Sequence, residues 1–281
     1  EVRIARAVLH DRTGTAAAEG TVGLDRGNRL NLTLVADGMD VRTALAIVFP
    51  EKNAPLEGAI SGNVDIRGTL SQPDIEIKLD TRHLVVGGIP LESASLDAGI
   101  VGDRIDLRLL QLFQAAGGYF EASGGFGFAG PISLTASARC FDISPLSAFW
   151  GWKYSFKGNV DLAMKVEGEL AHPSAALSLR IADGSAEKIK FDLLTARMTF
   201  DDGTVTIADG EIVHGRHKAT VKGRIPIAKE TLEAVGITSY ASDKEIDVSL
   251  QMTNAKLELI SMFYHGIEWA EGETNIDLHI A

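Results

Sequence analysis

The chain has 281 residues and a net charge of -11 at pH 7; 45% of the residues are apolar, but only 6% are aromatic. The acidic excess opposes binding to nucleic acid, which needs Lys and Arg against the phosphates, so no nucleic-acid partner is expected. No run approaches about 18 apolar residues, which excludes a bilayer-spanning helix in this sequence.

Apolar and polar residues alternate with a period of two through most of the chain. In an extended strand this spacing places apolar side chains on one face and polar side chains on the other. Roughly nineteen such strands can be counted, which predicts an all-β protein. The residues predicted by this parity to line the apolar face are Val64, Ile66, Ile75, Ile77, Leu79, Leu96, Ile105, Leu107, Leu109, Leu134, Val160, Leu162, Met164, Leu177, Leu179, Met198, Val248, Leu250, Ile276 and Leu278.

Turn-forming residues separate the strands, and short helices interrupt them. Turns are predicted at Gly87-Gly88, Gly102-Asp103, Asp183-Gly184 and Asp201-Asp202-Gly203. Helices of about two turns are predicted at residues 41–49, 145–152 and 258–264, and another at 229–235. The first three carry Phe49, Phe149, Trp150, Trp152, Phe263 and Tyr264. These aromatic side chains could fill space against the sheet or constrict a groove, and the sequence leaves both open.

An internal repeat organises the chain. Each of the first three helices is followed by a related strand: Gly62-Asn63-Val64-Asp65-Ile66, Gly158-Asn159-Val160-Asp161-Leu162 and Thr274-Asn275-Ile276-Asp277-Leu278. The period is about 100 residues, which predicts a quasi-linear object that grows along one axis. The predicted divisions are a partial preceding repeat at 1–40, units at 41–140 and 141–255, and the start of a third unit at 256–281.

The repeated stretches share a pattern that resembles a known family. A short helix is followed by G-x-hydrophobic-x-hydrophobic-x-G-x-L-x-x-P and then by many alternating strands; Pro73 and Pro173 end the two complete copies. This pattern is similar to the repeats of TamB-type and AsmA-like proteins of the diderm bacterial envelope. The resemblance implies a β-taco, an elongated half-pipe of antiparallel strands with an apolar groove inside and a few short helices.

The resemblance also implies a function and a location. It suggests periplasmic transport of phospholipid towards the outer membrane, with acyl chains as the partner of the groove, and an inner-membrane anchor outside this chain. The alternative is a module that assists insertion of outer-membrane proteins, with an outer-membrane barrel as a possible partner and strand pairing as its mode of binding. An extracellular β-helical adhesin is less favoured, because its repeats are usually much shorter.

No residues point to catalysis, a metal or a cofactor, so the chain is not expected to be an enzyme. Gly125-Phe126-Gly127-Phe128-Ala129-Gly130 matches a dinucleotide-binding pattern, but a strand-like segment follows where a helix is required. Glu211, His214 and His217 resemble metal ligands, but two residues three apart on one strand face opposite sides. The single cysteine, Cys140, is expected to be a thiol without a role.

Overall fold

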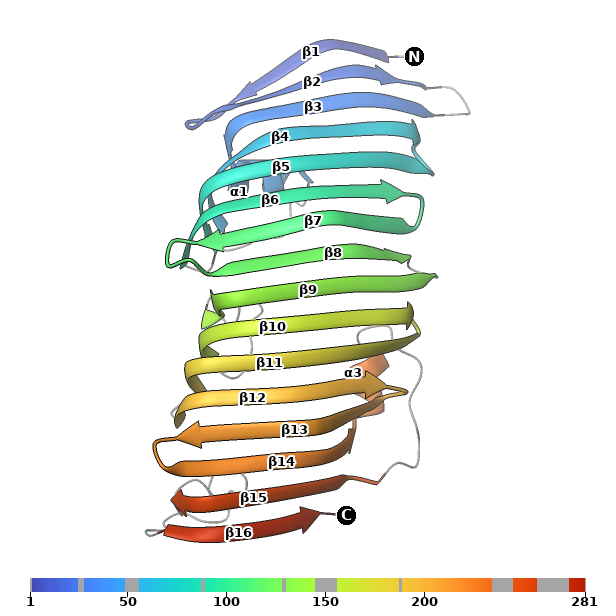
Figure 1. Ribbon diagram of the computed structural model, residues 1–281. Coiled ribbons are helices and arrows are strands. Elements are labelled where there is room, and N and C mark those ends of the chain that lie inside the picture. Colours follow the sequence, from blue (N-terminus) through green and yellow to red (C-terminus); the bar gives the residue numbers. More distant parts are fainter. Residues whose placement is uncertain are drawn as a thin grey trace.

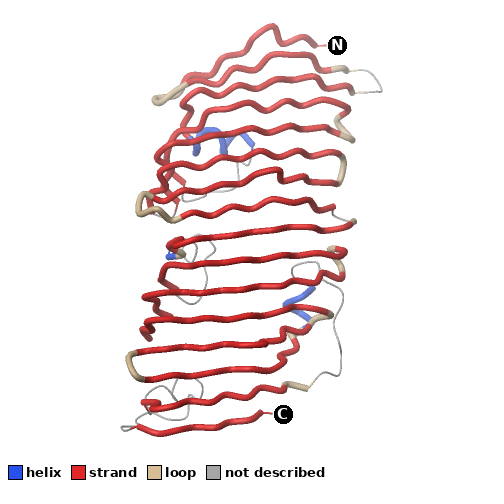
Figure 2. The backbone as a smooth tube through the Cα atoms, viewed as in Figure 1, coloured by secondary structure: helices blue, strands red, loops and turns tan. Residues whose placement is uncertain are grey.

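The structure, a computed structural model, is one open antiparallel sheet of sixteen strands in which every strand pairs with its neighbours in sequence (Figure 1). It describes residues 2–24, 28–48, 56–86, 89–127, 130–144, 156–186, 189–233, 245–256 and 273–280. The first and last strands lie at opposite ends of an elongated half-pipe, whose strands bend at one edge (Figure 2). With strands about 4.8 Å apart, the fifteen intervals extend over roughly 70 Å.

The elements follow one another along the sheet without a crossover. They are β1 (Val2–His10), β2 (Thr15–Val22), β3 (Arg29–Asp40), α1 (Val41–Val48), β4 (Leu56–Thr69), β5 (Pro73–Val86), β6 (Ile89–Val101), β7 (Arg104–Gln114), β8 (Tyr119–Gly127), β9 (Pro131–Asp142), β10 (Phe156–Glu169), β11 (His172–Ala186), β12 (Ile189–Asp201), β13 (Thr204–His214), β14 (His217–Pro226), α3 (Lys229–Glu233), β15 (Asp247–Lys256) and β16 (Glu273–Ile280).

The predicted all-β class and half-pipe shape are confirmed, and two of the predicted helices correspond to α1 and α3. The helices predicted at 145–152 and 258–264, with all six of the aromatic residues named for them and for 41–49, lie outside the described residues. Sixteen strands are described where roughly nineteen were expected from the alternation.

The turn prediction at Asp183-Gly184 is wrong. Both residues lie inside β11, where Asp183 takes a left-handed conformation (φ 49°) and the strand bulges against Gly158. An Asp-Gly pair supports positive φ in a bulge as readily as in a turn, so composition alone does not separate the two. The turn at Asp202-Gly203 is confirmed, with positive φ at both residues, and Gly102 also has positive φ (61°) in the turn between β6 and β7. Gly87 and Gly88 lie outside the described residues.

The G-x-L-x-x-P segments form the same turn in both copies. Gly68 and Gly168 have positive φ (89° and 108°), and the Leu that follows each donates its backbone N–H across the sheet edge. Leu70 donates to the Asn28 carbonyl (3.1 Å) and Leu170 to the Gly130 carbonyl (3.4 Å). The turn between β4 and β5 is therefore bonded to the residue before β3, and the turn between β10 and β11 to the residue before β9.

Successive groups of six strands repeat one pattern of lengths. Strands β4 to β9 have 14, 14, 13, 11, 9 and 12 residues. Strands β10 to β15 have 14, 15, 13, 11, 10 and 10. Long strands thus open each group and shorter ones close it, so the sheet widens and narrows with the period of the sequence repeat.

A bulge next to a glycine also recurs every six strands, in the pairs β1–β2, β7–β8 and β13–β14. In each pair a glycine with φ between 136° and 151° lies at the bulge: Gly20, Gly124 and Gly223. A Cβ on these residues would lie 1.9–2.1 Å from a backbone carbonyl oxygen of the next strand. Only glycine fits there, and the strands β1 to β3 share this feature with the two later groups.

Replacing the bulge glycine should destabilise the sheet locally. We expect Gly124→Ala to cost about 1–3 kcal/mol, because the new Cβ meets the Ser133 carbonyl at a backbone conformation hostile to alanine. The neighbouring Gly125→Ala is the control: its Cβ would lie 3.2 Å from the movable Arg104 side chain and 3.4 Å from the Ile105 carbonyl oxygen, an ordinary contact distance. A change of less than about 0.5 kcal/mol is expected. Urea unfolding followed by circular dichroism measures both; equal effects would contradict the explanation.

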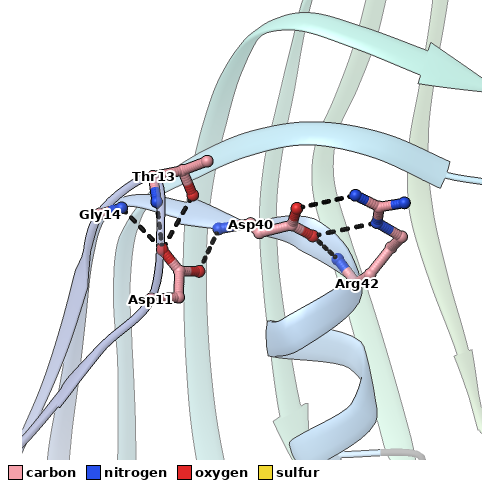
Figure 3. A network of polar contacts seen from close by, with 5 residues as sticks. All are labelled: Asp11, Thr13, Gly14, Asp40 and Arg42. Carbon is pink, nitrogen blue, oxygen red and sulfur yellow. Dashed lines mark hydrogen bonds and ion pairs between the residues drawn. The ribbon is translucent and has the colours of Figure 1, made fainter.

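The start of α1 is held by a carboxylate from a distant turn (Figure 3). Asp11 accepts hydrogen bonds from the N–H groups of Thr13 and Gly14 (2.7 Å each) and, through its other oxygen, from the Asp40 N–H (2.8 Å). Asp40 in turn accepts from the Arg42 N–H (2.8 Å) and guanidinium, capping the helix. These backbone donors, first that of Gly14, lower the pKa of Asp11 to about 2.

This network predicts an acid-sensitive region. The pKa of Asp11 in the folded chain (about 2) lies below the ordinary value of about 3.9, so the carboxylate stabilises the fold fully above that value. The contribution is lost as the pH falls through about 4 towards 2. Asp11→Ala should lower the melting temperature at pH 7 and flatten its dependence between pH 4 and pH 2.

Asp11→Asn is the matched variant, because it keeps an acceptor oxygen but cannot ionise. It should flatten the same pH dependence while retaining part of the stability at pH 7. Thermal unfolding measured by circular dichroism from pH 7 to pH 2 tests this. An unchanged acid profile in both variants would contradict the assignment of the acid-sensitive region to Asp11.

Candidate functional site

Five continuous rows of apolar side chains run along one face of the sheet, at right angles to the strands. Residues directly opposite each other in an antiparallel ladder point to the same side, so the strand registers trace each row from strand to strand. Rows are numbered from the edge with the G-x-L-x-x-P turns towards the curled edge near α1. Neighbouring rows are two residues apart, or about 6.7 Å.

Row 3 crosses all sixteen strands and contains only apolar residues and glycine. Its members are Leu9, Ala16, Ala36, Gly62, Leu79, Leu96, Leu110, Ala122, Ala136, Met164, Leu177, Met198, Ile207, Gly223, Val248 and Ile280.

The other four rows flank it. Row 1 is Ile4, Gly20, Leu32, Ile66, Ile75, Ile100, Ile105, Phe126, Ile132, Gly168 and Pro173. Row 2 is Ala7, Ala18, Leu34, Val64, Ile77, Ala98, Leu107, Gly124, Leu134, Val166, Ala175, Phe200, Val205 and Ile225. Row 4 is Met39, Ile60, Thr81, Ala94, Leu112, Phe120, Ala138, Leu162, Leu179, Ala196, Gly210, Val221, Leu250 and Leu278. Row 5 is Phe141, Val160, Ile181, Leu194, Ile212, Ala219, Met252 and Ile276.

The predicted lining residues fall on these rows with one exception, Leu109. A bulge in β7 places Leu109 opposite Asp97, whereas Leu110 lies opposite Leu96. In the next group of strands the equivalent residue is Asp209, which pairs with Arg197 by a 3.2 Å ion pair on the polar face. Leu110, not Leu109, therefore continues the apolar row.

The sequence pattern predicts Leu109 because a strict period of two runs through β7 without allowing for the bulge. Two adjacent leucines, Leu109 and Leu110, break the period of two, and that break was the available signal. The recurrence of the glycines opposite the bulges, Gly124 and Gly223, could have located it. A one-residue insertion shifts every later side chain to the other face unless the ladder absorbs it.

The rows differ in how well other parts of the chain cover them. Two buried clusters lie on rows 4 and 5 and at the curled edge; they centre on Phe141 (3% exposed) and Val160 (4%). Leu162 and Leu179, both predicted to line a groove, lie against these clusters. Most large side chains of rows 1 to 3, such as Leu79, Leu96, Met164 and Leu177, are only half-buried. In the described part, no large side chain is fully buried.

We call rows 1 to 3 the open track. It spans about 13 Å between its outer rows, and its described members include no charged or polar side chain. The one polar residue on the five rows, Thr81 in row 4, donates its hydroxyl to the Ala59 carbonyl (2.5 Å). Among the described side chains no buried nitrogen or oxygen lacks a partner. The track therefore offers apolar surface and no polar recognition.

The opposite face is polar and carries ion pairs between neighbouring strands. Arg108 contacts both Glu76 and Asp97, the latter at 2.6 Å. Arg180 reaches Asp161 at 3.2 Å, and Lys218 reaches Glu211 at 2.6 Å. Because these groups are exposed, each pair contributes little to stability. Their positions nevertheless identify the face opposite the five rows as the polar face of the sheet.

The candidate metal ligands do not converge. Glu211 pairs with Lys218, His214 lies 3.5 Å from Asp192, and His217 contacts the Asn254 carbonyl with its Nδ1. His214 and His217 lie opposite each other on β13 and β14, so the expectation that they share one strand and face opposite sides is wrong. No group of three possible metal ligands occurs among the described residues.

The glycine-rich segment also has no nucleotide-site geometry in its described residues. Gly125 and Gly127 end β8, and β9 begins at Pro131, so a strand rather than a helix follows. Cys140 is exposed and lies in a bulge with positive φ (46°). None of the helices described has the length and apolarity needed to cross a bilayer.

The register makes a direct prediction about adjacent leucines. Leu110→Ser should lower the free energy of unfolding by about 1–2 kcal/mol, because it removes apolar area from row 3. Leu109→Ser should change it by less than about 0.5 kcal/mol, because Leu109 shares a face with Asp97. Denaturant unfolding of the two variants tests the register. A larger effect at Leu109 would place the bulge elsewhere.

Comparison with known proteins gives one match. The TamB C-terminal domain family model matches residues 7–116, from β1 to just past the end of β7. No curated protein and no solved structure matches the chain. The match includes residues 7–40, which the sequence pattern alone tied less clearly to the repeat, and these strands carry the same glycine bulge as the later groups. Together with the open half-pipe sheet, the match over residues 7–116 supports assignment of the chain to the TamB family.

Proposed function

We propose that this chain is a section of a lipid conduit of the bacterial envelope, in which phospholipid acyl chains move along the open track. The family match over residues 7–116 supports a TamB-type envelope protein. The observation that carries the finer proposal is row 3, which passes through all sixteen strands without a polar side chain. The proposal involves periplasmic passage towards the outer membrane and no chemical reaction.

The physical properties of the open track favour sliding of an acyl chain over tight binding at one position. Each methylene removed from water contributes about 0.8 kcal/mol, so acyl chains would be held in proportion to their length. Since the described track has no charge or hydrogen-bonding side chain, one position is much like the next. The half-buried state of Leu79, Met164 and Leu177 leaves apolar surface available for a ligand. A headgroup would find its polar partners in water.

A second role, assistance in outer-membrane protein assembly, is an alternative that the family match supports equally. It would act by backbone hydrogen bonds between the sheet and a strand of another protein, whereas the conduit uses the apolar face.

Photo-crosslinking separates the two roles. A photo-reactive amino acid at Leu177, on row 3, should yield lipid adducts in cells, whereas the same group at exposed Ser178 should not. Protein adducts at Asp277 of β16, without lipid at Leu177, would instead support assembly by strand pairing. Lipid at neither Leu177 nor Met164 in folded protein would contradict the conduit.

A charged residue on the open track should weaken the binding of lipid at the neighbouring positions. Leu177→Asp should lower lipid recovery at a crosslinker placed at Met164, its direct cross-strand neighbour, by roughly tenfold, because about 1.4 kcal/mol of apolar contact is lost. Ser178→Asp, one residue away on the polar face, is the matched control and should leave recovery unchanged. Equal losses in the two variants would mean that the faces are not distinguished.

A further inference from the structure

The repeated features of the sheet move by one row from each group of six strands to the next. The bulge glycines Gly20, Gly124 and Gly223 lie in rows 1, 2 and 3 respectively. At the curled edge, the second-last residue of β3, Met39, lies in row 4, whereas the second-last residue of β9, Phe141, lies in row 5. A row that is traced by strand pairing therefore does not stay at one place in the repeat.

The rows consequently cross the half-pipe obliquely. The displacement is two residues for every six strands, or about 6.7 Å in roughly 29 Å along the sheet. Among the described strands, row 4 begins at Met39 of β3 and row 5 at Phe141 of β9, both at the curled edge. Row 1 ends at Pro173 of β11 and row 2 at Ile225 of β14, both at the edge with the turns. A row thus enters the sheet at one edge and leaves it at the other, a stagger like that of the strands in a barrel.

Burial follows the edges of the half-pipe rather than the rows. Thr81 of β5 and Ala94 of β6, in row 4, are buried (9% exposed each). Six strands later the same row is half-buried, at Leu179 of β11 and Ala196 of β12. The buried position of β11 is now in row 5, at Ile181 (7% exposed). The buried strip therefore keeps its place at the curled edge and changes its row.

The margin at the edge with the turns moves in the same direction. In β4 to β7 row 1 consists of the half-buried residues Ile66, Ile75, Ile100 and Ile105. In β10 and β11 it consists of Gly168, which has no side chain, and the buried Pro173. An acyl chain that stayed in row 1 would therefore lose apolar contact on reaching β10.

The half-buried part of the apolar face shifts accordingly. In β4 to β6 rows 1 to 3 are half-buried except at Ala98, and row 4 is half-buried only at Ile60. In β10 to β12 every residue of rows 2 to 4 is half-buried. Three rows thus remain accessible in each group of strands, but they are not the same three.

We propose that the path of the acyl chains steps from row to row, by one row for each six-strand unit, and so includes row 4 from β10 onwards. The middle of the path passes from Val64 in row 2 of β4 to Met164 in row 3 of β10. The inference rests on the proposed conduit function. It gives row 4 two roles, as part of the core in the first unit and as lipid contact in the second.

Two alanines in row 4 provide a matched test, because they differ only in their unit. Ala94 lies in β6 and Ala196 in β12, six strands apart. A photo-reactive amino acid is placed at each in the full-length protein in cells, and lipid adducts are measured. Leu96 and Met198, which lie in row 3 of the same two strands, serve as the reference positions.

The yield of lipid at Ala94 relative to Leu96 should be several-fold lower than the yield at Ala196 relative to Met198. A path that followed the rows would give equal ratios, and equal ratios in folded proteins would overturn the step while leaving the conduit standing. Absence of lipid at both Leu96 and Met198 would overturn the conduit itself.

A smaller substitution covers the case in which the crosslinker at buried Ala94 prevents folding. Ala94→Cys and Ala196→Cys are made in a Cys140→Ser background, which removes the single native thiol. Labelling of the purified proteins with an alkyl maleimide should be several-fold faster for Ala196→Cys, with circular dichroism confirming the fold of both. Equal labelling rates would overturn the step.

Discussion

The structure depends on one constraint, that a single antiparallel ladder must keep its apolar side chains on one face through sixteen strands. Because side chains alternate, any one-residue slip would send the rest of a strand to the wrong side. The bulges are where that slip is absorbed. Along β7 the apolar face continues from Leu107 in row 2 to Leu110 in row 3, and along β13 from Ile207 in row 3 to Gly210 in row 4, so the apolar face is restored after each bulge. The glycines opposite make this possible, since no other residue fits so close to the neighbouring carbonyl.

From this constraint follows an unusual distribution of burial. A sheet normally covers its apolar face with a second layer. Here the described sheet has its buried clusters at the curled edge, around Phe141, Val160 and Phe191, and the remaining rows are half-exposed. Stability therefore comes from the hydrogen-bonded ladder and a narrow core along one edge. Among the described residues the rest of the apolar face is half-exposed, and the polar face carries exposed ion pairs.

The same local structure recurs in each six-strand unit along the sheet. Strand lengths, bulges and positive-φ positions recur with the six-strand period, although the side chains at equivalent places differ. Asp11 and Gln114, a carboxylate and an amide, accept from the N–H groups of Asp40 and Asp142, which lie at equivalent places. Ser61, Asp161 and Asn275 likewise accept from the equivalent N–H groups of Gly38, Cys140 and Asn254. Each unit therefore repeats a hydrogen-bond acceptor for a backbone N–H, or a residue with positive φ, rather than a particular side chain. A sheet of any length can be built by adding such units, because each contacts mainly its neighbours.

The fold class, the elongated form and nearly all of the apolar face follow from the sequence pattern alone. Alternation with a period of two assigns Val64, Ile77 or Leu177 to one side whatever their neighbours are, because the pleat is a local property of the chain. Local signals also located α1 and the turn at Asp202-Gly203. Only the tertiary structure decided what depends on the adjacent strand: that Leu110 replaces Leu109, that Asp183-Gly184 is a bulge, and that Leu162 and Leu179 lie against a core while Leu177 lies on the open track. A bulge and its coverage are set by the register and exit angle of neighbouring strands, which no local pattern in a single strand contains.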